Sequence, residues 1–187
     1  DQVLSPIKRG IRPDPIRLID NAPIPNINCC RNDTFHIPMI LIEFPDAFAT
    51  YNRNQFEQIM NQEGYSHLNY ENSGSFRDFY QEISYGQFLP HADISDWIIA
   101  PQVHDYYAYS NPNGYSRVRE LVRAMVDSLE ESGFDWTKYD NDGDGYVDAL
   151  NLLHQGPGAE EGDQSNIWSH KWSLGNLAVT YDGVTID

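Results

Sequence analysis

The chain has 187 residues, with 28 acidic and 12 basic side chains, a formal net charge of -16 and a pI near 4.5. This length suits one ordinary domain, and the negative charge argues against a nucleic-acid partner and against adsorption to anionic lipid. The most apolar stretch, Ile37 to Phe44, is far shorter than the roughly 20 residues of a membrane helix. We therefore expect a soluble chain without a membrane span.

The first 32 residues differ in composition from the rest of the chain. Residues 1–32 are predicted to form a proline-rich extended arm or linker, and residues 33–187 to form the compact domain. The only cysteines, Cys29 and Cys30, are neighbours and cannot close a loop within the chain. Each either bonds to a segment outside the chain, stays free, or pairs with the other. The prolines of the arm are Pro6, Pro13, Pro15, Pro23 and Pro25.

The domain begins with the pattern of a buried strand. The β-branched apolar run Ile37–Phe44 ends at Pro45 and predicts a central strand covered on both faces, with Pro38 at its start. A short helix follows around Asn54 to Gln62. Apolar residues at i, i+3, i+4 and i+7 then predict a second helix, which has Ser75 near its amino-terminal cap and ends at Gly86.

Two strands and a long helix are predicted in the second half. Residues 87–99 have strand character, and a single apolar stripe predicts a helix from Ser116 to Gly133. The partly alternating stretch from Tyr146 to His154 reads as a further strand. This order of strands and helices predicts an α/β or α+β domain with a twisted, mixed sheet and packed helices.

An aspartate-rich loop precedes that last strand. Calcium takes six to eight oxygen ligands, and loops that wrap it place side-chain ligands at positions one, three, five and nine, with a backbone carbonyl at seven. The sequence Tyr139-Asp-Asn-Asp-Gly-Asp-Gly-Tyr-Val-Asp148 has this spacing. It predicts a calcium site formed by Asp140, Asp142, Asp144, the carbonyl of Tyr146, and Asp148.

The loop departs from the helix-loop-helix calcium site at its end. Position twelve holds Asn151 where that site has a bidentate Glu, so another group must complete the shell, and Glu160 and Glu161 are candidates. The alternative is that the Asp and Gly residues form solvated Asx turns without a metal. Four carboxylates this close would then repel one another without a compensating cation.

No catalytic constellation is visible in the sequence. None of the six histidines stands four residues from another, and no His-Glu-x-x-His occurs, so no helix presents a zinc pair. Ser169 and His170 are adjacent, and on a strand they would point to opposite faces. The flanking Trp168 and Trp172 are better explained by cation–π or core-edge contacts.

The order of five sequence blocks resembles the immune-inhibitor-A-like metallopeptidases, and the resemblance covers roughly Ile37 to Asp187. The blocks are Ile40–Asp46, Gly74–Tyr80 with Ser84–Phe88, Tyr139–Asp148, His154–Glu160 and Ile167–Trp172. The resemblance implies a zincin-like fold and a secreted bacterial zinc endopeptidase that acts on protein or peptide substrates. It also implies that the zinc helix lies downstream of Asp187, so the fold here is incomplete and this chain holds no catalytic residue.

Two functions follow as expectations. The first is the amino-terminal portion of a secreted endopeptidase that is inactive alone, carries structural calcium, and has the remaining catalytic half as a partner. The alternative is a non-catalytic, calcium-stabilised extracellular module without the zinc helix.

Overall fold

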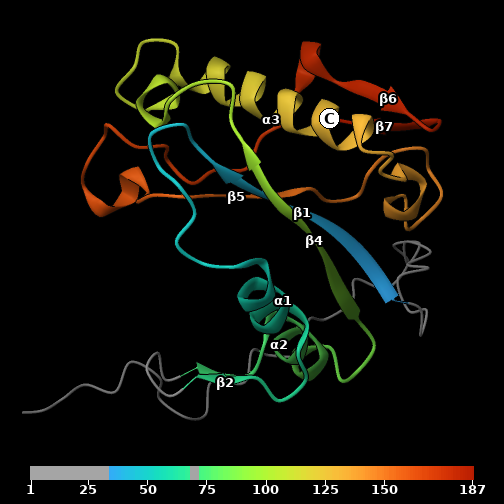
Figure 1. Ribbon diagram of the computed structural model, residues 1–187. Helices are drawn as coiled ribbons and strands as arrows, with labels where there is room; N and C mark the ends of the chain where they lie inside the picture. The colour runs from blue at the N-terminus through green and yellow to red at the C-terminus, as the bar shows by residue number, and fades with distance from the viewer. Residues whose placement is uncertain (1–33, 68–71) are drawn as a thin grey trace, which may run out of the picture.

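Three parallel strands form the centre of the protein in a computed structural model, which describes residues 34–67 and 72–187 (Figure 1). β1 (Thr34–Glu43) lies between β4 (Leu89–Ile99) and β5 (Asn151–His154). All three strands were predicted, although β1 begins earlier than expected and β5 is limited to the second half of its predicted range. The first part of that range instead contributes a single bridge, from Tyr146 to Thr185.

The expectation that Pro38 opens the first strand is wrong. Pro38 is the fifth of ten residues in β1. The carbonyl of Ile42 accepts a hydrogen bond from Gln155, just beyond β5, and by the alternation along a strand Pro38 presents its backbone nitrogen to the same side. Since β5 pairs with β1 only from Met39 onward, the donor that proline lacks is not needed there.

The helices cover the two faces of this sheet separately (Figure 1). The main core lies between one face and α3 (Gly114–Glu131), where Ile40, Ile42 and Phe44 meet Leu121 and other residues of the helix. A smaller cluster on the other face joins Met39 and Leu41 to residues of α1 (Arg53–Asn61). The side chains of β1 therefore alternate between two cores, as the apolar run predicted.

Local capping explains where the shorter helices begin. α2 (Phe76–Ile83) starts after Ser75, whose side chain accepts from Asp78 N–H while the Asp78 carboxylate accepts from Ser75 N–H. Asn52 and Gln55 form the same reciprocal box at the start of α1. The predicted Ser75 cap is confirmed, and so are all three predicted helices, with small shifts at their ends.

Short elements complete the fold and were not predicted. Two antiparallel hairpins pair β2 (Ser66–His67) with β3 (Asn72–Ser73), and β6 (Val179–Tyr181) with β7 (Val184–Ile186). The 3-10 helices are η1 (His104–Tyr107), η2 (Trp136–Tyr139), η3 (Ala159–Glu161) and η4 (Gly175–Leu177).

The mixed α/β class is confirmed, with one difference in strand direction. Among the described residues the central sheet is parallel, and the antiparallel strand pairs are the two hairpins, with one isolated antiparallel bridge between Phe44 and Ala47. The predicted arm, residues 1–32, and its two cysteines lie outside the described residues. Within residues 34–67 and 72–187, no helix is both long and apolar enough to cross a membrane.

Candidate metal centre

The aspartate loop runs from η2 toward β5 and curls back on itself at two glycines. Gly143 and Gly145 have φ values of 79° and 88°, a left-handed conformation that a residue with a Cβ adopts at a cost. These two turns bring alternate residues of the loop to one side. One carboxylate oxygen each of Asp140, Asp142 and Asp144 consequently lies within 4.8 Å of the other two.

Backbone N–H groups of the loop hold these carboxylates in place. Asp140 accepts through Oδ1 from Gly143 (2.8 Å) and Asp144 (2.9 Å), and through Oδ2 from Gly145 (3.0 Å). Asp144 Oδ1 accepts from the Tyr146 N–H at 2.9 Å. The Asp144 bond reaches two residues on and is an Asx turn, as is the bond from the Asp144 N–H to Asp142 Oδ1, whereas the Asp140 bonds span three to five residues. Together these bonds orient the three carboxylates whether or not a cation is bound.

The other predicted ligands lie differently. Asp148 Oδ2 accepts from the backbone N–H of Asn141 at 2.7 Å and from its side-chain amide at 3.1 Å, so this oxygen faces Asn141. Glu160 is hydrogen-bonded to Ser169 Oγ, and neither it nor Glu161 belongs to a metal-sized group among the described residues. Asn151, at position twelve, opens β5 opposite Met39.

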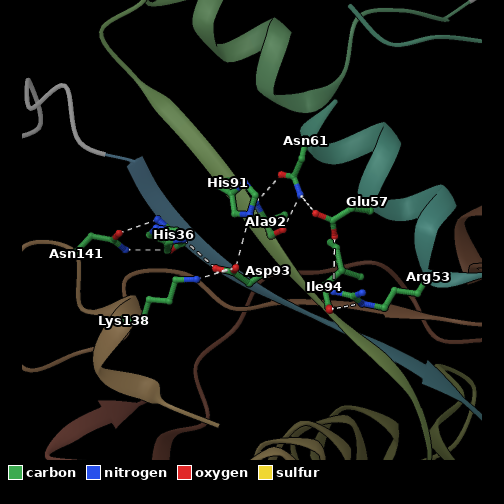
Figure 2. Close-up of polar contacts among 10 residues, drawn as sticks. All are labelled: His36, Arg53, Glu57, Asn61, His91, Ala92, Asp93, Ile94, Lys138 and Asn141. Atoms are coloured by element: carbon green, nitrogen blue, oxygen red, sulfur yellow. Dashed lines mark hydrogen bonds and ion pairs between the residues drawn. The ribbon is translucent and has the colours of Figure 1, made fainter. Parts of the chain in front are cut away.

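Asn141 joins the loop to the sheet, a role that was not predicted (Figure 2). Its side-chain oxygen accepts from the His36 N–H at 2.8 Å, and its amide nitrogen donates to the His36 carbonyl at 3.0 Å. The side chain therefore satisfies both backbone groups of one β1 residue, as a neighbouring strand would. No local pattern reveals this contact, because the two residues are 105 positions apart.

Beside this anchor, Asp93 gathers donors from three elements (Figure 2). Its carboxylate contacts His36 Nδ1 at 2.9 Å, Lys138 Nζ at 2.8 Å and His91 Nε2 at 3.6 Å. Burial opposes its ionisation, but hydrogen bonds from Lys138 and His36 hold the pKa of Asp93 below its ordinary value. Burial, reinforced by the nearby Asp93 carboxylate, also raises the pKa of the Tyr139 hydroxyl.

The remaining histidines belong to no metal-sized group within residues 34–67 and 72–187. The rings of His104 and His154 are 5.4 Å apart and both pack on Phe44, and burial lowers the pKa of each imidazole. His170 Nδ1 contacts the Trp168 carbonyl, whereas Ser169 Oγ donates to Glu160. Ser169 and His170 thus have separate partners.

A cation–π contact of the kind expected for the tryptophans is present at Trp172. Arg119 of α3 lies over the indole, with its guanidinium carbon 4.0 Å from the ring centroid. The sequence pointed to the segment Ile167–Trp172 but could not identify Arg119 as the cation, because it lies 53 residues earlier in the chain.

Comparison with known proteins gives a consistent match over most of the chain. The profile of the immune inhibitor A peptidase M6 catalytic domain matches residues 30–186. Immune inhibitor A of Bacillus thuringiensis subsp. alesti is 27% identical over 131 residues, which cover 58% of this chain and 19% of that protein. Pre-pro-metalloprotease PrtV of Vibrio cholerae serotype O1 (strain M66-2) is 26% identical over 176 residues, which cover 75% and 19% respectively. The chain thus spans about a fifth of the length of these curated relatives.

Proposed function

Because the chain belongs to the immune inhibitor A peptidase M6 family, we propose that it forms the amino-terminal portion of a secreted zinc-dependent endopeptidase. The observation that carries the proposal is the match of residues 30–186 to the catalytic domain. This match supports peptide-bond hydrolysis as the activity of the whole enzyme, with a protein or peptide as its substrate.

The zinc that such a peptidase uses does not fit the described residues of this chain. Zinc favours imidazole and thiolate ligands, with three protein ligands in a catalytic site. The single metal-sized group found among the described residues consists of three aspartates, whose oxygens suit calcium or magnesium better. We therefore place the zinc ligands and the catalytic residues outside this chain, which we expect to be inactive alone.

The aspartate loop would hold structural calcium in this enzyme. Asp140, Asp142 and Asp144 supply carboxylate oxygens, and the proposed shell adds the Tyr146 carbonyl and Asp148. The charge repulsion among the three close carboxylates supports a cation there. Since Asn141 ties the same loop to β1, calcium would stabilise the junction of η2, the loop and the sheet.

Activity and zinc dependence test the proposal together. The chain is compared with a polypeptide continued through the sequence that its gene encodes downstream, using a protein substrate with and without a zinc chelator. The longer polypeptide should cleave the substrate, lose activity with the chelator and regain it with added zinc, while residues 1–187 alone should not cleave.

The alternative is a non-catalytic, calcium-stabilised extracellular module. No two histidines of this chain have zinc-binding spacing, and this favours the non-catalytic alternative. A longer polypeptide without His-Glu-x-x-His, and without activity at any zinc concentration, would establish this alternative and contradict the peptidase proposal.

A further inference from the structure

Two half-buried histidines meet where the parallel strands of the central sheet end. His154 is the last residue of β5, and His104 is the first residue of η1. Their ring centroids lie 5.4 Å apart, and each ring packs edge-on against Phe44, whose side chain is fully buried. These two residues, which we call the histidine pair, therefore attach η1 to the sheet through ring contacts.

The surroundings of the His104 ring suit an uncharged imidazole. Its Nε2 atom is buried and has no hydrogen-bond partner among the described residues. The ring faces Gly156, where an added Cβ would lie 3.5 Å from Nε2, so the backbone closes this side. Because an imidazolium carries a proton on both ring nitrogens, charging His104 would create a buried donor without an acceptor, which folded proteins rarely contain.

Within the described residues, no carboxylate hydrogen-bonds to a ring nitrogen of the histidine pair. Asp46 Oδ1 accepts from the His104 backbone N–H at 2.9 Å, and the Glu160 carboxylate accepts from a serine. His154 Nδ1 contacts the backbone carbonyl of the next residue at 3.2 Å. Two charged rings at this distance would repel each other. The titratable groups around the pair, from the loop after β1, from η1 and from η3, are Asp46, Asp105, Tyr107 and Glu160.

Both imidazoles are harder to protonate in the folded protein than in the unfolded chain. Burial lowers the pKa of His104 and of His154 below the ordinary value of 6.5, and a charge on His154 lowers the pKa of His104 further. The nearby carboxylates raise these pKa values but offset burial only in part. As the pH falls below 6.5 the unfolded chain binds protons first. The stabilisation by the pair is therefore complete above 6.5 and is lost as the pH falls through the lowered folded pKa values.

We propose that the histidine pair is an acid-sensitive contact: protonation below neutral pH separates the two rings and releases η1 from the end of β5. η1 is the part that moves, because residues 101–103 before it are exposed, whereas β5 is held in the sheet by β1. A released His104 ring reaches water, where Asp46 and Asp105 favour its charged form. The contact lies within this chain, so it does not depend on the proposed function.

Hydrogen exchange measures this release, with η4 as a matched control. The amides of Tyr106 and Ala108 are hydrogen-bonded at η1, and those of Leu177 and Ala178 are bonded in the same way at η4, which contains no histidine. Between about pH 7 and pH 5, after correction for intrinsic exchange, the protection of the η1 amides should fall about tenfold, while protection at η4 should change less than about twofold. Equal changes at both would overturn the proposal. Asp93 does not contribute, because its stabilisation is lost only below pH 3.8.

Replacing either ring by phenylalanine removes its titration and keeps an aromatic side chain against Phe44. His104→Phe and His154→Phe should each reduce the acid response of η1 to about threefold or less, since two charged rings can no longer form. His170→Phe is the control, because His170 belongs to the exposed segment 168–173, and it should keep the full response. A control that loses the response as completely as the pair variants do, or pair variants that keep it, would contradict the inference.

Nuclear magnetic resonance tests the same inference on the unsubstituted protein, so it does not require any variant to fold. The imidazole proton signals of His104 and His154, assigned through their contacts with the Phe44 ring, are followed from about pH 8 to pH 4. Both should titrate with a pKa below 6.5, and the loss of η1 protection should have the same midpoint. Titration of either ring at or above 6.5, or protection of η1 that stays constant while both rings become charged, would overturn the proposal.

Discussion

Two regions of the molecule differ in how many of their groups find a partner among the described residues. One is formed by the sheet edges at His36 and Ala92, and the other is a groove of about 580 Å³ between α3, β5 and residues 168–173. At the edges, two asparagines act alike: Asn141 bonds both backbone groups of His36 in β1, and Asn61 of α1 bonds both backbone groups of Ala92 in β4 (Figure 2). In the groove, Arg119 Nε has no acceptor among the described residues and Trp172 is half exposed. The chain itself thus satisfies the backbone groups at the edges, whereas the described residues leave part of the groove exposed.

The largest loss of stability is expected at Asp93, whose carboxylate contacts His36, His91 and Lys138. Asp93→Ala should lower the free energy of unfolding by about 3 kcal/mol, because it removes two hydrogen bonds to an ionised carboxylate, from Lys138 and from His36, each worth roughly 1.5 kcal/mol. Chemical denaturation measures the loss. Asp96→Ala, at an exposed site on the same strand, is the control and should change stability little; equal losses would mean that the Asp93 contacts add nothing.

The same carboxylate predicts a pH dependence. The pKa of Asp93 is lowered in the folded protein, so its stabilisation is present above the ordinary value of 3.8 and is lost as the pH falls through the lowered folded value. Asp93→Asn should remove this acidic contribution. A variant whose stability falls with acid as steeply as that of the unsubstituted protein would contradict it.

Calcium removal should come next in size. At free calcium about a hundredfold above its dissociation constant, binding to the folded state alone adds about 2.7 kcal/mol, and a chelator should lower the melting temperature accordingly. Asp142→Asn should abolish most of this response. Asp163→Asn is a matched control, because Asp163 also accepts from a backbone N–H two residues on but lies outside the three-carboxylate group. A chelator without effect would favour simple Asx turns.

The two asparagines at the sheet edges, Asn141 and Asn61, can be compared directly. Asn141→Ala and Asn61→Ala each remove two bonds to a strand edge and should cost about 2 kcal/mol, since backbone groups lose their partners. Only Asn141→Ala should also weaken calcium binding, measured by calorimetric titration, because Asn141 lies inside the loop. An equal loss of calcium affinity in both variants would refute a specific role for Asn141 in holding the loop.

The smallest effect is expected in the groove. Arg119→Met keeps much of the side-chain length but removes the cation over the half-exposed Trp172 indole, and should cost about 0.5 kcal/mol in residues 1–187, as expected for a cation–π pair near the protein surface. Thermal unfolding measures it. A loss as large as that at Asp93 would show that the groove is already a stabilised part of this chain.

Local sequence patterns predicted much of the fold but few of the polar contacts between distant segments. Ser75 was identified as a helix cap and is one, because a cap depends on residues three positions apart. The aspartate spacing likewise placed Asp140, Asp142 and Asp144 in one loop, and one carboxylate oxygen of each lies within 4.8 Å of the others; the calcium site itself stays a prediction. The prediction misplaced Pro38, because a proline is accepted within β1 only where β5 does not pair with it. The apolar sequence run does not show where that pairing begins.

The sequence by itself determined the helices, the central strands and the curl of the aspartate loop, since periodicity, caps and glycines act over a few residues. Only the tertiary structure decided that Asn141 would join that loop to His36, and that Lys138 would meet Asp93 from 45 residues away. Such pairs depend on strand register and on how η2 packs beside the sheet. They are fixed by the three-dimensional arrangement of distant segments, because no short-range pattern encodes a contact between them.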